Sequence, residues 1–330
     1  MILIFCETIN ISSKQVLEYL RIENQKFETF TENDVIEFTY EINDSCFSYK
    51  VYKNDKFICL DSQIKSIWYS RVDIRVKNIE IQNVLNKNEL AYKELESYSV
   101  EYNYVRYSKI IECLHSKKCL GTFGKGNFNK ISFLEKCNEL RIGIPDTLIT
   151  SSKLELISFL KKHNNSGIIT KSLGVPYLEL ISKDLDVEKW KRGVTVEVNS
   201  NDLIQIPDTF QLSLFQNKIE KEFEIRTFYL NGDCYSMAIF SQSTELSMLD
   251  CRLGDDIKMR RCSYTLPKMV EKKVCELMKS LNLNTGSLDI ILTKKGDFVF
   301  LEVNPVGQFG DVSYLTNANI EYRIAKYLID

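Results

Sequence analysis

Apolar residues along the first part of the chain recur with two periods, and these periods predict its first elements. A short apolar run at residues 2–5 is typical of a buried strand. Apolar residues at helical spacing between 16 and 20 predict a helix, which Ser12 or Ser13 can cap. A strand followed by a helix indicates an α/β unit.

The pattern then changes to further strands and a long helix. Residues alternate between apolar and polar at 47–51, and an apolar run follows at 57–60. Another strand is predicted at 66–69, and residues 79–115 are rich in helical signals. We therefore predict that residues 1–120 form an N-terminal α/β domain.

A glycine-rich stretch, GTFGKGN, marks a change of character at residues 121–127. It is the densest turn signal in the chain. After it, Asn129 can cap a helix that runs to Leu140 and that Gly143 closes. We predict a domain boundary here, followed by a central subdomain at 121–212.

Short elements alternate within this central part. We predict a strand at 147–150, a helix that ends near residue 162, and a strand at 168–171. The alternating valines at 194–198 predict one strand of a hairpin, with 203–206 as its partner.

The rest of the chain, 213–330, is predicted to be a C-terminal subdomain built on antiparallel strands. The runs LFQNKI, EIRTFYL and CYSMAIFS read as strands, and the Asn231-Gly232 pair between the last two predicts a tight hairpin turn. The remaining elements are a helix, two strands and a final helix. They are predicted at 268–281, 286–293, 298–304 and from Ile320 onward.

Composition narrows the class of protein. Of 330 residues, 44% are hydrophobic and 27% are charged, which is typical of a soluble globular protein. The net charge of -2 gives no long-range attraction to nucleic acid. We find neither a secretory signal nor an apolar run long enough to cross a membrane, so we expect a cytoplasmic protein without membrane contact. The ten cysteines include no CxxC pair, which argues against zinc.

The final hairpin carries the most informative pattern. A symmetric turn centred on residues 295–296 brings Ile290 opposite Leu301. The same register brings Asp289 opposite Glu302. One face of the hairpin is then apolar and the other polar. The apolar face carries Leu288, Ile290, Leu292, Val299, Leu301 and Val303, and the polar face carries Ser287, Asp289, Glu302 and Asn304.

Two carboxylates directly opposite each other on paired strands repel, so something must offset the repulsion. A divalent cation bound by Asp289, Glu302 and Asn304 would do so, because all three supply hard oxygen ligands. We therefore predict a magnesium site on this face. The alternative is a solvated sheet face on which both acids reach water.

Magnesium often accompanies a nucleotide, but the familiar phosphate motifs are absent. No GxxxxGK[ST] occurs, and neither does HRD or DFG, which excludes a P-loop enzyme and an ordinary protein kinase. Two lysines stand out by position. Lys130 lies in the first turn of the helix after the glycine-rich stretch, and Lys171 ends a strand. Glu224 and Arg226 share one face of the strand EIRTFYL.

Taken in this order, these residues and the LEVNP ending resemble the ATP-grasp superfamily over residues 121–330. The resemblance implies an α/β (α+β) protein with an ATP-grasp fold behind an N-terminal α/β pre-ATP-grasp domain. It implies a ligase that uses ATP and Mg²⁺ and releases ADP and phosphate. It also assigns roles to particular residues. Lys130 and Lys171 would hold phosphates, and Asp289, Glu302 and Asn304 would bind the metal. The adenine would be lined by Gln216, Asn217, Lys218 and Ile219, and Glu224 would bind the ribose. Arg226, with Arg260 or Arg261, would face the phosphates and the acyl intermediate.

A narrower resemblance covers most of the chain. The stretches SIWYSR, SLFQNKIEKEFEIRTFYLNG, YSMAIFSQ, NTGSLDII and FLEVNPVGQFGDVS resemble the peptide maturases of the grasp-with-spasm and microviridin type. Such enzymes activate side-chain carboxylates of a ribosomally made precursor peptide as acyl phosphates. They join them to hydroxyls or amines as esters or amides, and they usually recognise a leader segment. The resemblance therefore implies macrocyclisation of a peptide.

Other functions stay open at this point. An amino-acid or glutamate ligase acting on a small molecule or a protein tail would use the same metal and ATP residues. A non-catalytic nucleotide-binding or peptide-binding protein is a further alternative. Tyrosines between residues 92 and 107 fall on a helical stretch, and they suggest a possible homodimer. Packing of the same tyrosines in the core is the alternative to that interface.

Overall fold

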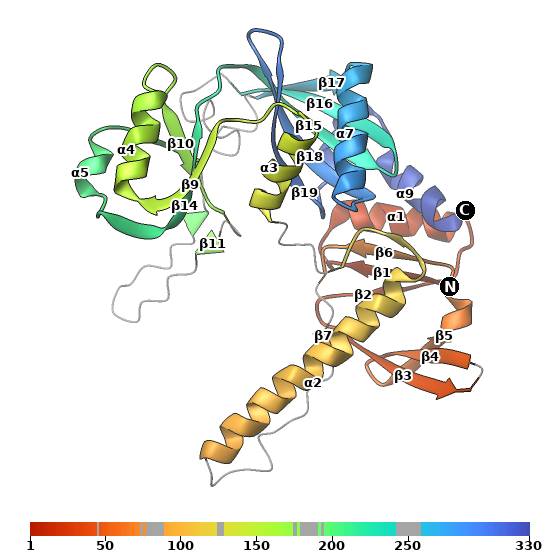
Figure 1. Ribbon diagram of the computed structural model, residues 1–330. Helices are drawn as coiled ribbons and strands as arrows, with labels where there is room; N and C mark the ends of the chain where they lie inside the picture. The colour runs from red at the N-terminus through yellow and green to blue at the C-terminus, as the bar shows by residue number, and fades with distance from the viewer. Residues whose placement is uncertain are drawn as a thin grey trace. The chain divides into compact units, whose positions relative to one another are not determined.

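The protein is described by a computed structural model (Figure 1), which divides into two compact units. Unit 1 comprises Met1–Gly126 and Asn319–Asp330, and unit 2 comprises Asn127–Ala318. The structure describes residues 1–44, 46–72, 75–76, 89–123, 129–173, 177–178, 191–192, 195–241 and 259–330, with the backbone alone at 89–97, 177–178 and 191–192. Residues 124–127 of the glycine-rich stretch and the first part of the helix predicted from 79 lie outside these ranges. The three-part division at 120 and 212 stays a prediction.

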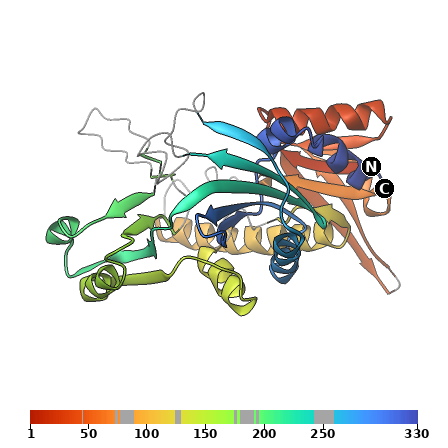
Figure 2. The same cartoon turned by 90° about the horizontal axis from the view of Figure 1, so that it is seen from above.

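A four-stranded parallel sheet of order β2-β1-β6-β8 forms the centre of unit 1. Its strands are β1 (Ile2–Cys6), β2 (Phe27–Phe30), β6 (Ser66–Ser70) and β8 (Lys118–Leu120). Every residue of β1 is buried, as expected for a central parallel strand. Helices α1 (Ile11–Ile22) and α9 (Ile320–Ile329) lie side by side (Figure 2), and Ser66 Oγ in β6 donates to the carbonyl of Leu328. The strand and helix predicted at the start of the chain are confirmed.

Asn10, and not Ser12 or Ser13, caps α1. Its Oδ1 accepts a hydrogen bond from the backbone N–H of Ser13 at 3.0 Å. The helix therefore begins at Ile11, one residue before the predicted caps. The reason is that Asn10 has extended backbone geometry while Ser12 and Ser13 are already helical, and a cap residue is not yet helical.

A second sheet of unit 1, of order β5-β4-β3-β7, is mainly antiparallel. It contains β3 (Val35–Asn43), β4 (Cys46–Lys53), β5 (Lys56–Leu60) and β7 (Arg75–Val76), with a 3₁₀ turn η1 (Asp61–Gln63) after β5. The rings of Phe38 and Tyr49 stack across β3 and β4 at 4.8 Å. Helix α2 (Glu89–His115) follows in the chain. The mixed α/β class predicted for this part is confirmed.

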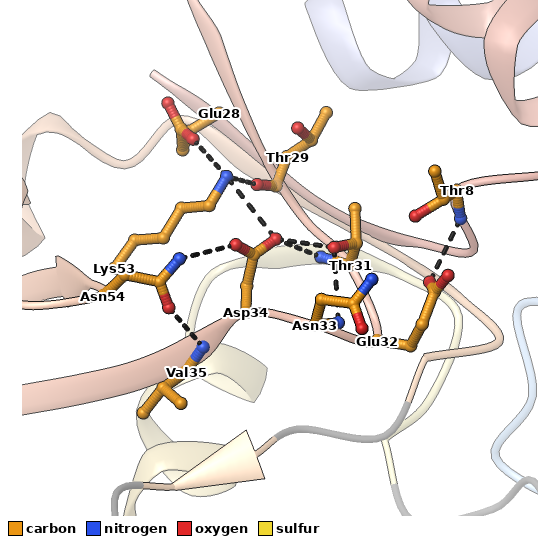
Figure 3. A network of polar contacts seen from close by, with 10 residues as sticks. All are labelled: Thr8, Glu28, Thr29, Thr31, Glu32, Asn33, Asp34, Val35, Lys53 and Asn54. Carbon is orange, nitrogen blue, oxygen red and sulfur yellow. Dashed lines mark hydrogen bonds and ion pairs between the residues drawn. The ribbon is translucent and has the colours of Figure 1, made fainter.

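A polar network joins the two sheets of unit 1 (Figure 3). The ammonium of Lys53, at the end of β4, lies 2.8 Å from Glu28 and 3.5 Å from Asp34. The same Asp34 carboxylate accepts from the backbone and hydroxyl of Thr31. One lysine therefore ties the end of β2 to the start of β3.

The first part of unit 2 is a four-stranded sheet of order β13-β10-β14-β9. Its elements are β9 (Thr147–Ser152), α4 (Lys153–Lys162), β10 (Ile168–Lys171), β13 (Val196–Val198), α5 (Asp202–Gln205) and β14 (Thr209–Asn217). A short pair, β11 (Tyr177–Leu178) and β12 (Lys191–Arg192), stands apart from this sheet. Leu156 of α4 packs with Ile168 and Phe215 on one face, which leaves the other face for different contacts.

The predicted hairpin between 194–198 and 203–206 is wrong. Residues 202–205 form the short helix α5, and β13 pairs with β10 instead. Leu203 in this helix and Ile206 just after it pack, partly buried, against the Leu156 cluster, so their apolar character reflects burial and not strand pairing. A short apolar run cannot distinguish these two structures.

The second part of unit 2 is a five-stranded antiparallel sheet of order β17-β16-β15-β18-β19. Its strands are β15 (Lys221–Leu230), β16 (Asp233–Phe240), β17 (Arg260–Tyr264), β18 (Thr285–Thr293) and β19 (Phe298–Asn304). Helices α3 (Lys130–Glu139) and α7 (Lys268–Ser280) share one hydrophobic core with it, and α8 (Gly310–Thr316) packs against β16 and β17. The core contains Phe133, Cys137, Val274, Leu277, Ile225, Leu288, Ile290 and Phe300.

Two local predictions for unit 2 are confirmed. Asn231 and Gly232 connect β15 to β16, both with positive φ, as a two-residue hairpin turn requires. Asn129 caps α3, and its Oδ1 accepts from the backbone N–H of Ile131. Among the helices in the described ranges, none combines the length and apolar character needed to cross a membrane.

Candidate active site

A row of polar side chains crosses one face of the five-stranded sheet. Arg226 in β15 lies directly opposite Asp289 in β18, and Asp289 lies directly opposite Glu302 in β19. Directly opposite residues project to the same face of a sheet. The other face carries Ile225 and Ile290, which belong to the core against α3 and α7. The predicted pairing of Asp289 with Glu302 on a polar face is confirmed.

The predicted register also holds for the pairs Leu288–Val303 and Ser287–Asn304, but between Asp289 and the turn it is wrong by one residue. Ile290 lies opposite Phe300, because Leu301 is an extra residue that forms a β-bulge. Nearer the turn, the backbone N–H of Thr293 donates to Asp297, and Gly296 has φ of 89°. The loop thus adds one residue to a symmetric turn, and the bulge restores the register at Asp289. Phe300, 1% exposed, takes the core position predicted for Leu301.

Each of the two facing carboxylates has a cationic partner. Arg226 donates to both oxygens of Asp289, from Nε at 2.8 Å and from an Nη at 3.0 Å. Lys130 Nζ lies 3.4 Å from Glu302. A bidentate guanidinium–carboxylate pair fixes the planes of both groups. The repulsion that motivated the metal prediction is therefore offset in this structure by Arg226 and Lys130.

Lys171 also approaches β19, from β10 in the four-stranded sheet of unit 2, which we call the smaller sheet. Its Nζ lies 3.5 Å from the carbonyl oxygen of Leu301, the bulged residue of β19. Lys130 Nζ also donates to the carbonyl of Ser172, the next residue in the chain, at 2.8 Å. The two predicted phosphate-binding lysines therefore converge on β19 beside Glu302. Their separation in the sequence is 41 residues, so the fold and not local spacing brings them together.

The predicted adenine residues lie at the end of β14. Gln216 and Lys171 share one face of the smaller sheet, because Lys171 pairs with Leu214 two residues before Gln216. Asn217 projects to the opposite face, and Lys218 forms an ion pair with Glu197 at 2.8 Å. Ile219 is half-buried just beyond the strand.

The buried amide of Gln216 has one unused acceptor. Its Nε2 donates to Thr147 Oγ1 at 3.0 Å, and the Thr147 hydroxyl donates to the carbonyl of Pro145. Within the described ranges, Gln216 Oε1 accepts no hydrogen bond although it is buried. An unsatisfied buried acceptor is costly, so this oxygen is suited to a donor supplied by a ligand.

The strand register separates the two candidate arginines of β17. Arg261 and Glu224 both lie opposite Ile239, so Arg261 shares the face of Glu224 and Arg226. Arg260 lies on the opposite face, where its guanidinium is 4.4 Å from the centre of the Phe240 ring. The structure thus brings Arg261 to the polar face and does not bring Arg260 there.

Asn304 lies opposite Ser287 at the end of the polar row. Its side chain is exposed, and Oδ1 accepts from the backbone N–H of Val306 at 3.1 Å. The loop after Asn304 is held tightly against β18, because a Cβ at Gly307 would lie 2.2 Å from Ser287 Oγ. Glycine is therefore required at 307 for this close approach.

Two carboxylates and one amide on adjacent strands match the ligands that Mg²⁺ prefers. Asp289, Glu302 and Asn304 fit such an ion if phosphate oxygens and water complete its octahedron. The ranges that the structure describes contain no cluster of three or more His, Cys, Asp or Glu side chains arranged as a metal cage.

Sequence reasoning missed two residues of this face, Lys221 and Ser241. Both contact the Glu224 carboxylate. Counting alternate residues from Phe223 puts Lys221 on the core face, so the sequence pattern alone would exclude Lys221 from the polar face. Glu222 is an extra residue that forms a bulge in the register of β15 with β18, and this bulge moves Lys221 to the polar face.

Comparisons with known proteins identify the fold. No protein-family model and no curated protein matches the chain. The macrocyclase MdnC from Microcystis aeruginosa MRC, solved with the precursor peptide MdnA, is 21% identical, with a TM-score of 0.76 over 100% of this chain and 99% of MdnC.

Two further solved structures have similar folds. A RiPP-associated ATP-grasp ligase from Chryseobacterium gregarium, in complex with ADP and a leader and core peptide, is 22% identical, with a TM-score of 0.75 over 100% of this chain and 95% of that one. The ATP-grasp ligase PsnB, complexed with a minimal precursor, Mg and ADP, is 13% identical, with a TM-score of 0.68 over 99% of this chain and 97% of PsnB. The chain therefore has the ATP-grasp fold of these peptide ligases.

Proposed function

We propose that this protein is an ATP-dependent peptide maturase, which activates side-chain carboxylates of a ribosomally made precursor peptide and joins them to hydroxyl or amine side chains. The observation that carries the proposal is the convergence of Lys130, Lys171 and Arg226 on the Asp289–Glu302 pair, in a fold shared with ligases solved with precursor peptides. The proposed partner is a precursor peptide with a leader segment.

The proposed chemistry needs no enzyme nucleophile. A carboxylate is a poor electrophile, and transfer of the γ-phosphoryl group from ATP converts it to an acyl phosphate with a good leaving group. Attack by a hydroxyl or an amine then gives an ester or an amide and releases phosphate, with ADP as the other product. The enzyme contributes positions and charges, as in other phosphoryl transfers.

Each candidate residue has a distinct task in this scheme. Lys130 and Lys171 hold phosphate oxygens, and Arg226 and Arg261 balance the charge that develops during transfer. Asp289, Glu302 and Asn304 would hold Mg²⁺, which supplies charge neutralisation at the phosphates when it is bound. Each oxygen of Asp289 accepts one hydrogen bond from Arg226 and keeps a further lone pair, so the same carboxylate could also coordinate the ion.

The residues proposed to bind the adenine and the ribose lie at the end of β14 and in β15. Gln216, with Asn217, Lys218 and Ile219, is proposed to line the base, and the unused Gln216 Oε1 is suited to its amino group. Glu224 is proposed to accept from the ribose. Arg260 is the weakest member of the predicted set, since it stacks on Phe240 on the other face.

Replacing Lys130 or Lys171 with Ala is expected to weaken the binding of Mg·ATP by about 10- to 100-fold, because each change removes one charge-assisted phosphate contact. Calorimetry with ATP and Mg²⁺ measures this. Lys136→Ala is a matched control, since Lys136 lies in the same helix as Lys130 and pairs with Glu139 at 2.6 Å. Unchanged affinity in both test variants would remove these lysines from the nucleotide site.

We also propose a cellular location and an oligomeric state for this protein. A cytoplasmic enzyme fits a chain with many thiols, most of them buried or half-buried in the described ranges. A homodimer is proposed from α2, where Tyr98, Tyr102 and Tyr104 are 60%, 45% and 70% exposed. Light scattering at micromolar concentration measures this, and a monomer mass would contradict it.

The test of the function uses short peptides encoded beside this gene. Incubation with enzyme, Mg²⁺ and ATP is expected to yield ADP and phosphate together with a peptide that has lost water. An amino-acid ligase, the second candidate, would instead add an external amino acid to its substrate. A non-catalytic binding protein would consume no ATP with any peptide. Nucleotide chromatography and peptide mass spectrometry distinguish the three.

A further inference from the structure

We propose that Lys221 and Ser241 are positioning residues that hold the Glu224 carboxylate, so that its second oxygen accepts hydrogen bonds from the vicinal hydroxyls of a nucleotide ribose. The inference rests on the proposed function for the identity of the ligand. It adds two residues to the site, and neither carries a role in the ATP-grasp resemblance described above.

Both residues contact the same oxygen of Glu224. Lys221 Nζ and Ser241 Oγ each donate to Glu224 Oε1, the serine at 2.8 Å. The side chains of Lys221 and Glu224 are only 8% and 16% exposed, so this ion pair is shielded from water. A shielded charged pair with good hydrogen bonds is far more rigid than an exposed one. The Glu224 carboxylate therefore has a fixed plane.

A β-bulge brings Lys221 to Glu224. Side chains alternate along a strand, so Lys221 would normally share the core face of Phe223. The register of β15 with β18 shifts by one residue between Lys221 and Phe223, with Glu222 as the extra residue. The bulge turns Lys221 to the face of Glu224 and Arg226. Bulges that redirect a side chain in this way are over-represented next to active sites.

The second oxygen of Glu224 is left available. Within the residues that the structure describes, Glu224 Oε2 accepts no hydrogen bond, whereas Oε1 accepts two. Oε2 is also not among the fully buried unsatisfied atoms. A carboxylate oxygen has lone pairs for two donors, which matches a pair of neighbouring hydroxyls. Lys221 balances the carboxylate charge, so no second cation is needed at Oε2.

The alternative is that Lys221 and Ser241 only stabilise the fold. A ligand that lacks one hydroxyl separates the two roles, because a purely structural defect weakens ATP and its deoxy analogues equally. The quantity to measure is the ratio of the Kd of 2′-deoxy-ATP or 3′-deoxy-ATP to the Kd of ATP, each with Mg²⁺, by calorimetry. A charge-assisted hydrogen bond to Oε2 is expected to make the larger ratio about tenfold in the unmodified protein.

In the Lys221→Met variant the ratio is expected to fall to about one, since Glu224 loses its orientation. Lys221→Arg is expected to restore most of the ratio, and Ser241→Ala to reduce it partly. Lys162→Met is a matched control that should keep the ratio, because it removes an exposed lysine paired with Asp146 elsewhere in unit 2. Thermal unfolding of each variant checks that the fold is retained.

The inference is overturned if Lys221→Met folds and keeps the full ratio. If that variant does not fold, an unchanged ratio in Ser241→Ala overturns it equally. Absence of any ATP binding by the unmodified protein is a different result, which would contradict the proposed function itself. Binding of ATP with a ratio near one in the unmodified protein would contradict only the role of Glu224 Oε2 and its two supports.

Discussion

Replacing Asp289 with Asn is expected to lower the rate of peptide modification by about 10²- to 10³-fold, the range seen when one preorganised electrostatic contact is removed from an active site. Asparagine cannot accept two charge-assisted bonds from Arg226, and it is a poorer ligand for Mg²⁺ than a carboxylate. Glu302→Gln is expected to act in the same direction, since Glu302 is the other carboxylate of the pair. Single-turnover kinetics with a saturating peptide measures both.

The control for this prediction is Asp297→Asn, in the exposed turn of the same hairpin, which should keep full activity. Stability gives a second readout. Repulsion between facing carboxylates alone would make Asp289→Asn more stable. The bidentate pair with Arg226 reverses that expectation. A drop of about 2–4 °C in Tm, corresponding to about 1 kcal/mol, is expected in the absence of nucleotide. Full activity in both acid variants would indicate a solvated face without metal.

Replacing Arg226 with Lys is expected to lower kcat by about 10²-fold while changing the Kd of ATP by less than about tenfold. A lysine keeps the charge but cannot bridge the two oxygens of Asp289, nor two oxygens of a transferring phosphoryl group. The loss should therefore appear in the transition state more than in the bound ground state.

The measurement pairs calorimetry for ATP with single-turnover kinetics for peptide modification. Arg141→Lys is the control, because Arg141 is exposed at the end of α3 and is expected to leave both quantities unchanged. Equal losses in ATP affinity and in rate would mean that Arg226 only binds nucleotide. No loss in either would remove Arg226 from the site.

Local signals in the sequence were sufficient for much of unit 2. The Asn231-Gly232 turn needs two residues with positive φ, which asparagine and glycine tolerate best. The cap at Asn129 depends on one side chain and its own helix. The polar character of the positions around Asp289 and around Glu302 follows from alternation along each strand, whereas their pairing was predicted correctly because the extra loop residue and the bulge at Leu301 cancel. Each of these features is decided within a few residues, so a pattern in the sequence can predict it.

Features that depend on an extra residue in a strand were not predictable. The bulge at Leu301 moves Phe300 into the core, and the bulge at Glu222 moves Lys221 to the polar face. Counting alternate residues assumes a regular ladder, and one inserted residue reverses every later assignment. The choice between Arg260 and Arg261 needed the register of β17 with β16, which no local pattern in the sequence provides.

Contacts between distant segments also required the fold. Lys130 and Lys171 meet at β19 only because α3 and the smaller sheet both pack beside that strand. The segment around α5 is a different case, since Leu203 in the helix and Ile206 just after it are partly buried, and a strand would have buried them equally well. The apolar pattern of this segment predicts that its side chains are buried, but it does not predict whether they lie in a helix or in a strand.

Mass spectrometry of a precursor peptide encoded beside this gene, after incubation with the enzyme, Mg²⁺ and ATP, tests whether this protein is a peptide maturase. We expect a peptide lighter by one water for each bond formed, only when ATP is present, with one ADP released per bond. Ring closure is favoured because both reacting side chains belong to one chain and have a high effective concentration. Release of AMP, or a peptide made heavier by an added amino acid, would contradict intramolecular bond formation through an acyl phosphate.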